Sequence, residues 1–235
     1  MATDTSLDMG TDDMGEKLAY NDMDRREFLK KSAIGIASVA AVSVLGKTDY
    51  DMMEENDEQT EENTNTMKKI VILNGSPRRN GYTAALIQAF AEGAQSAGNE
   101  VREHYIHGMN VNYCIGCDNC MRTHQGCVQK NDGMQKIYDD LTWCDVVVFA
   151  CPEYWGTFTA QLKTVIDRMF AWFNLDSLPS TQRDCVLLMT ARGNDYSMAL
   201  DQYGIFPKYL GWNNLGTVLG RGLTDEARAL GASIK

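Results

Sequence analysis

The chain has 235 residues, of which 44% are hydrophobic and 4 are prolines, and its formal net charge is −10. This composition excludes a collagen-like chain, a disulfide-dense mini-protein and a wholly disordered chain, and the acidic balance argues against a nucleic-acid partner. The acidity is uneven, because residues 1–66 hold 16 acidic and 6 basic side chains, whereas residues 67–235 hold 16 of each. All 7 cysteines lie in the second part. The sequence therefore predicts a leader and a tether ahead of one neutral domain.

The predicted leader covers residues 1–46. It contains Arg25-Arg26-Glu27-Phe28-Leu29-Lys30-Lys31, followed by an uncharged stretch of small and apolar residues over 33–45. This stretch is shorter than the roughly 20 residues of a membrane-spanning helix and is typical of a signal peptide. The segment resembles a twin-arginine signal, which implies export to the periplasm or cell surface. A buried helix in a cytoplasmic protein is the alternative, and the poor cleavage site at Ala41-Val42-Ser43 leaves an uncleaved membrane tether open.

Residues 47–66 are acidic, rich in Asn and Thr, and almost free of large aliphatic side chains. Such a segment buries too little apolar surface to offset the entropy of ordering it, so we expect a flexible tether.

Alternating strands and helices are expected over 67–235. Short apolar runs predict strands over 68–73, 100–106, 145–150, 184–190 and 214–219. Helical spacing predicts helices after Thr83 and over 133–141, 159–173 and 224–233, and the third of these has an apolar stripe of Leu162, Val165, Ile166, Met169 and Phe170. This order indicates an α/β fold with a doubly wound five-stranded parallel sheet. Ligands bind such sheets at the carboxyl ends of the strands, which directs attention to the loops after the first, third and fourth strands.

The loop after the first strand reads Gly75-Ser76-Pro77-Arg78-Arg79-Asn80-Gly81-Tyr82-Thr83. A glycine-containing loop that opens a helix offers backbone N–H groups to an anion. The loop has neither the Lys-Ser/Thr of nucleotide-triphosphate sites nor the Gly-x-Gly start of the dinucleotide fingerprint. It resembles the phosphate loop of the flavodoxin-like NAD(P)H-dependent FMN reductase family. The resemblance implies the strand order 2-1-3-4-5 and an FMN phosphate held by Ser76, Arg78, Asn80, Gly81, Tyr82 and Thr83.

The loop after the third strand carries a second match to that family, in Cys151-Pro152-Glu153-Tyr154-Trp155-Gly156 and the later Lys163 and Asp167-Arg168. The resemblance implies a flavin ring beside Pro152, Glu153, Tyr154, Trp155 and Gly156, with Thr190 and Gly193 of the loop after the fourth strand at its edge. The alternatives are that Tyr154 and Trp155 only pack, that the charged residues form ion pairs on a helix face, and that the last loop is an ordinary turn.

Four cysteines form a compact group with the spacing C-x2-C-x2-C-x6-C inside a predicted insertion over 113–128, namely Cys114, Cys117, Cys120 and Cys127. Three thiols at this spacing favour an iron–sulfur cluster over zinc, and free thiols or a disulfide stay open. The group resembles the cysteine motif of iron–sulfur flavoproteins, and Asn131-Asp132 resembles their acidic pair. His124 is expected to be exposed, and Cys144, Cys151 and Cys185 are expected to be buried.

The resemblance implies an FMN-dependent oxidoreductase with a [4Fe–4S] cluster that passes electrons to a small acceptor such as a quinone or to a redox partner protein. Its electron donor would be NAD(P)H or, if the domain is exported, a protein or a quinol. An electron carrier without its own substrate, and a metal- or thiol-binding module without flavin, are the alternatives. The resemblance also implies a homodimer. We assign no catalytic residue, because the flavin itself accepts the hydride.

Overall fold

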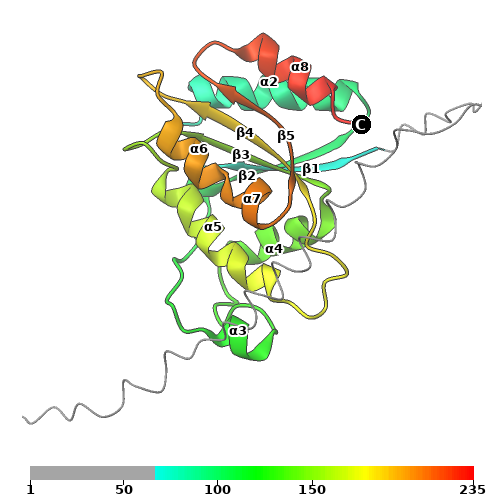
Figure 1. Ribbon diagram of the computed structural model, residues 1–235, viewed down its shortest axis with the longest axis vertical. Helices are drawn as coiled ribbons and strands as arrows, with labels where there is room; N and C mark the ends of the chain where they lie inside the picture. Colours follow the sequence, from blue (N-terminus) through cyan, green and yellow to red (C-terminus); the bar gives the residue numbers. More distant parts are fainter. Residues whose placement is uncertain (1–66) are drawn as a thin grey trace, which may run out of the picture. The chain divides into compact units, whose positions relative to one another are not determined.

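The computed structural model describes residues 67–235, and the predicted leader and tether lie outside the described residues. The five predicted strands form within this part of the chain: β1 (Lys69–Asn74), β2 (Glu100–Tyr105), β3 (Val146–Pro152), β4 (Asp184–Thr190) and β5 (Asn213–Leu219). They pair in parallel in the order β2-β1-β3-β4-β5 (Figure 1). The prediction of a flavodoxin-like doubly wound sheet is confirmed.

Helices cover both faces of the central strands, so both faces of these strands carry apolar side chains. On β1, Val71 and Leu73 face one core and Ile70 and Ile72 face the other, and all four are fully buried. Near-continuous apolar runs are the signature of such strands. The edge strand β2 is only partly buried, and its sequence, EVREHY, is correspondingly polar.

Helices α2 (Tyr82–Ser96) and α8 (Thr224–Ala232) lie side by side on one face of the sheet (Figure 1). Glycines allow this close approach. A Cβ atom at Gly93 would lie 2.1 Å from the carbonyl oxygen of Arg228, and one at Gly231 would lie 2.1 Å from that of Phe90. The two helix backbones therefore touch, and no larger residue fits at either glycine.

The other face is covered by α4 (Met134–Trp143), α5 (Ala160–Phe173), α6 (Ser197–Tyr203) and α7 (Ile205–Tyr209). The sequence did not predict α6 or α7, which are short and of which the second contains Pro207. They contribute Tyr203 and Phe206 to an aromatic cluster around Phe149 of β3. The predicted apolar stripe of α5 is wrong in one position, because Phe170 is 49% exposed.

A long connection between β2 and α4 carries the four grouped cysteines. It contains a short 3-10 helix, η1 (Ile106–Gly108), and the five-residue helix α3 (Asn119–Thr123). Figure 1 shows α3 projecting beyond the C-terminal part of α5, away from the sheet. Among residues 67–235, no helix has the length and apolar character that a membrane crossing needs.

Candidate functional site

A cavity of about 730 Å³ opens at the carboxyl ends of the strands, at the switch point between β1 and β3. The loops after β1, β3, β4 and β5 line it. Eleven of the thirteen residues that the sequence proposed for cofactor binding contribute to its wall: Ser76, Arg78, Asn80, Gly81, Tyr82, Thr83, Pro152, Glu153, Tyr154, Trp155 and Thr190. The other two, Gly156 and Gly193, do not line it.

The loop after β1 is fixed by close contact with the start of α5. A Cβ atom at Gly75 would lie 2.6 Å from Cβ of Leu162 and 2.8 Å from the hydroxyl oxygen of Thr159, so only glycine fits there. The Thr159 hydroxyl donates to the carbonyl oxygen of Gly75 at 2.8 Å. This contact fixes where the loop enters the cavity.

Hydroxyl groups shape the cavity wall beyond Gly75. The Ser76 backbone N–H donates to Asn74 Oδ1 at 2.9 Å, and its Oγ accepts the Arg78 N–H at 3.2 Å. The hydroxyls of Thr83 and Thr190 lie 2.8 Å apart and are both buried, which ties the first turn of α2 to the end of β4. These groups are held in place by the protein before any ligand arrives.

The first turn of α2 faces this cavity with no acidic residue and no side-chain cap. Gly81 at the N-cap has an extended backbone. Uncapped N–H groups and the positive end of the helix dipole favour an anion, and the exposed Arg78 adds a full positive charge.

The loop after β3 forms a tight turn closed by a bridge between Tyr154 and Thr157. Trp155 has a left-handed backbone (φ 51°) and its side chain is 98% exposed at the cavity, so it does not pack into the fold. A non-glycine residue in this conformation costs free energy. Gly156 also has a positive φ and lies against Met198 of α6, so it shapes the turn from outside the cavity.

Sequence reasoning missed two cations of the cavity wall, Arg192 and Arg221. The Arg221 guanidinium lies 4.9 Å from the ring centroid of Tyr82, which is a cation–π contact. Arg221 follows β5 at the same carboxyl edge, so the edge rule applied to the fifth strand would have found it.

The four grouped cysteines line a second, small cavity of about 60 Å³ beside the C-terminal half of α5. Cys114 and Cys117 are exposed, and Cys120 and Cys127 are partly buried. Burial raises the pKa of the Cys120 thiol, and the nearby Cys127 and Cys114 raise it further. All four are free thiols in this structure.

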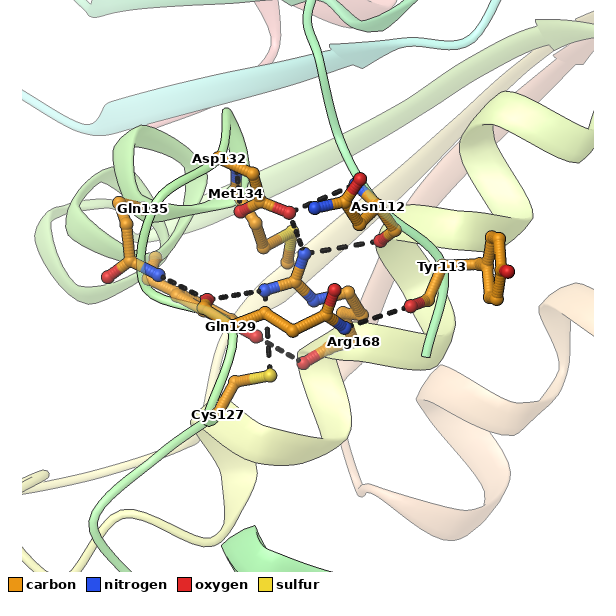
Figure 2. A network of polar contacts seen from close by, with 9 residues as sticks. Asn112, Tyr113, Cys127, Gln129, Asp132, Met134, Gln135 and Arg168 are labelled. Atoms are coloured by element: carbon orange, nitrogen blue, oxygen red, sulfur yellow. Dashed lines mark hydrogen bonds and ion pairs between the residues drawn. The ribbon is translucent and has the colours of Figure 1, made fainter. Parts of the chain in front are cut away.

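One buried guanidinium holds this cysteine loop to α5 (Figure 2). Arg168 forms an ion pair with Asp132 in which both side chains are buried, and it donates to Cys127 Sγ at 3.5 Å. Burial opposes ionisation of Asp132, but the backbone N–H of Asn112 and the Arg168 guanidinium outweigh it and lower the pKa of that carboxyl. On the exposed face of α5, the predicted ion pair forms between Lys163 and Asp167, and Arg168 takes no part in it.

The family model for NADPH-dependent FMN reductase matches residues 68–221. The chain belongs to this family. Its match begins just before β1 and ends just after β5, so it includes the cavity at the strand ends and the cysteine loop.

Several relatives are named iron–sulfur flavoproteins. One from Methanocaldococcus jannaschii is 35% identical over 127 residues, which are 54% of this chain and 62% of that protein. One from Archaeoglobus fulgidus is 31% identical over 147 residues, covering 60% and 66%, and one from Clostridioides difficile is 32% identical over 145 residues, covering 57% and 63%. The chain thus spans less than two thirds of the length of these relatives.

Solved structures share the fold. A NAD(P)H:quinone oxidoreductase from Methanothermobacter marburgensis superposes with a TM-score of 0.53 at 19% identity, covering 71% of this chain and 95% of that one. An azoreductase from Bacillus anthracis gives a TM-score of 0.54 at 18% identity, covering 72% and 100%. At these identities the likeness concerns the fold alone.

The two cavities of this FMN reductase family member offer different chemical groups, one set suited to FMN and the other to an iron–sulfur cluster. The strand-end cavity has the size of a small-molecule site, roughly 300–1,000 Å³, and combines anion donors with flat aromatic faces. In residues 67–235 no three His, Cys, Asp or Glu side chains are grouped so as to hold a metal ion. Four soft thiols around one cavity nevertheless suit an iron–sulfur cluster, which is larger than a single ion and takes thiolates at its corners.

The remaining thiols are buried, as predicted. Burial raises the pKa of Cys144 and of Cys151 to about 12 and that of Cys185 to about 11. They are inert small hydrophobic groups at neutral pH. His124 is exposed, also as predicted, and its Nδ1 lies 3.1 Å from the carbonyl oxygen of Asn174.

Proposed function

We propose that this chain is an FMN-dependent oxidoreductase that also binds a [4Fe–4S] cluster and passes electrons to a small acceptor such as a quinone. One observation carries the proposal. Residues chosen from two separate sequence motifs, in loops about 70 positions apart along the chain, line a single cavity at the ligand-binding edge of the sheet. The matching family model supports FMN as its occupant.

The phosphate of FMN would lie at the loop after β1, where the N-terminal amides of α2, the Ser76 and Thr83 hydroxyls and the Arg78 guanidinium gather. The ring would lie along Pro152–Trp155 and the end of β4. Bound there, FMN supplies hydride acceptance and one-electron transfer. The protein binds the phosphate, orients the ring against the rigid ends of the strands, and leaves one side open to an acceptor.

The cluster would be held by Cys114, Cys117, Cys120 and Cys127. The names of the relatives support this assignment, as does the group of four thiols beside a buried cation. A cluster transfers single electrons, which complements a flavin that takes up two.

We further propose that the domain is exported, with residues 1–46 as a twin-arginine signal that lies outside the described residues. Nicotinamide cofactors are cytosolic, so an exported enzyme would take its electrons from a protein or a quinol. A reporter fused to the full chain tests this proposal, with Arg25→Lys and Arg26→Lys together as the matched variant. Export that the double variant does not abolish would contradict it. The homodimer stays a prediction.

The function is tested on the full chain purified without oxygen. We expect a flavin absorption spectrum, iron and sulfide in the protein, and steady-state reduction of a quinone. Flavin and iron without turnover would favour the electron carrier. Iron without flavin would favour the metal-binding module and would overturn the proposal. Rapid oxidation of NADPH together with a cytosolic reporter would overturn the proposed export and donor while leaving the flavin site intact.

A further inference from the structure

Arg168 carries a buried positive charge, with a side chain that is 1% exposed, and its ion-pair partner Asp132 has a side chain that is 0% exposed. Burying a guanidinium costs several kcal/mol unless the group is paired and hydrogen-bonded. Arg168 lies on α5 and lines the cavity that the four grouped cysteines share. A charge retained there calls for a physical reason.

The guanidinium joins both ends of the cysteine loop to α5 (Figure 2). Nη1 donates to Asp132 and to the carbonyl oxygen of Asn112 at 3.1 Å, and Nη2 donates to the carbonyl oxygen of Gln129 at 3.0 Å. The first cysteine of the group is two residues after Asn112, and the last is two residues before Gln129. One side chain therefore fixes where both arms of the loop begin.

Two features are not needed to join the cysteine loop to α5. Nη2 also donates to Cys127 Sγ at 3.5 Å. The Nε–H is buried without a hydrogen-bond partner, and Arg168 is the only residue in the described part of the chain with such an orphaned side-chain atom. A buried donor without an acceptor lowers the stability of the folded protein. This donor belongs to a residue that lines the four-thiol cavity. The bonds that join the loop to α5 require neither the contact with Cys127 Sγ nor the unpartnered Nε–H.

We propose that Arg168 is a positioning residue for a thiolate-bound centre: it holds Cys127 in place, donates hydrogen bonds toward the sulfur atoms, and raises the reduction potential of the cluster. This inference rests on the proposed four-cysteine cluster. The physical reason is that reduction adds negative charge to the centre, and a nearby fixed cation with N–H groups directed at sulfur stabilises the reduced form. Hydrogen bonds to cluster sulfurs are among the factors that set such potentials.

Two variants of Arg168 separate charge from geometry. Arg168→Lys keeps a positive charge but has no planar fork to reach several acceptors. Arg168→Met combined with Asp132→Asn removes the charge together with its counter-charge, so no buried ion is left unpaired. Lys163→Met is the matched control, because it removes a cation from the exposed side of the same helix, where Lys163 pairs with Asp167.

The first measurement is the reduction potential of the cluster in the full chain, followed by electron paramagnetic resonance during a redox titration. We expect the cluster of the Arg168→Met, Asp132→Asn protein to be about tenfold harder to reduce, which is about 59 mV for one electron, because the sulfur atoms lose the N–H donors of Arg168 while the net charge of the site is unchanged. The reduction potential of Arg168→Lys should lie between those of the double variant and the wild type, and that of Lys163→Met should equal the wild-type value. Equal potentials in all four proteins, each with full iron content, would overturn the proposal.

The second measurement is amide hydrogen exchange over residues 111–133 in the metal-free full chain. Both Arg168 variants should exchange faster there than the wild type, with the strands unchanged, and Lys163→Met should not differ from the wild type. If the wild type takes up no iron, the proposed function fails, and the exchange data alone decide the positioning role. Unchanged exchange over 111–133 would overturn that role.

Discussion

The two cavities of this protein are held together in different ways. The strand-end cavity is formed by loops that leave four neighbouring strands of a rigid sheet, and its hydroxyls at Ser76, Thr83 and Thr190 are buried and fixed by hydrogen bonds. The cysteine cavity is formed by one long connection, whose first two thiols are exposed, and by the part of α5 beside it. The first site is organised by the fold, whereas the second depends on a single buried arginine and on whatever the thiols bind.

The largest expected effect is the loss of one site with the other intact. Cys117→Ser removes one of four thiolates, and we expect nearly all iron and sulfide to be lost while the flavin content stays at the wild-type level. The measurement is iron, sulfide and flavin per chain. Cys144→Ala is the control, since this thiol is buried away from the group and its loss should leave all three values unchanged. Loss of flavin in Cys117→Ser would show that the two sites are not independent.

A second difference concerns thiol reactivity. Burial raises the pKa of Cys144 and Cys151 to about 12 and of Cys185 to about 11, so at pH 8 almost none of each is thiolate. We expect an alkylating reagent to label the exposed Cys114 and Cys117 of the metal-free protein much faster, because the buried thiols are shielded from the reagent and held in the unreactive protonated form. Mass spectrometry of labelled peptides measures this. Comparable rates would mean that the strand thiols are accessible.

The Asp132–Arg168 pair gives the cysteine region a pH dependence. The folded protein lowers the pKa of Asp132, so the stability that the pair contributes is full above about pH 4 and is lost as the pH falls through the folded value. Asp132→Asn breaks a fully buried pair, and we expect it to cost about 3–5 kcal/mol at pH 7 and less in acid. Urea unfolding at a series of pH values measures both effects. A cost that does not change with pH would contradict this account.

The phosphate loop should respond more gradually. Ser76→Ala combined with Arg78→Ala removes one hydroxyl and one cation from the cavity wall. Hydrogen bonds to a charged group contribute about 1.5–3 kcal/mol, so we expect FMN to bind at least about tenfold more weakly. Quenching of flavin fluorescence on titration of the apoprotein measures the affinity. Arg79→Ala is the matched control, because Arg79 lies outside this cavity and stacks on Tyr105 at 4.3 Å.

The sequence predicted the features that depend on local pattern. Runs such as IVIL and VVVFA are recognisable as strands buried on both faces, and the loops that follow them lie at the ligand-binding edge because parallel strands end together. The short helices α6 and α7 were missed because five to seven residues, one of them a proline, give no clear period.

The Asp132–Arg168 pair was missed for a different reason. Its members are 36 positions apart, and only the folded chain shows that α5 runs beside the cysteine loop. Lys163 and Arg168 look alike in the sequence, yet one is on the surface and the other is buried. Burial of a particular helix face depends on which loop packs there, and a single helix does not encode that.

The central claim is that flavin and cluster occupy two independent sites. It is tested most directly by measuring flavin, iron and sulfide side by side in three proteins, each supplied with the same limiting amount of FMN: the full wild-type chain, Cys117→Ser, and the Ser76→Ala, Arg78→Ala protein. We predict that the first variant loses only iron and sulfide and that the second loses only flavin. Full flavin occupancy in the second variant, or loss of both cofactors in either, would contradict the account.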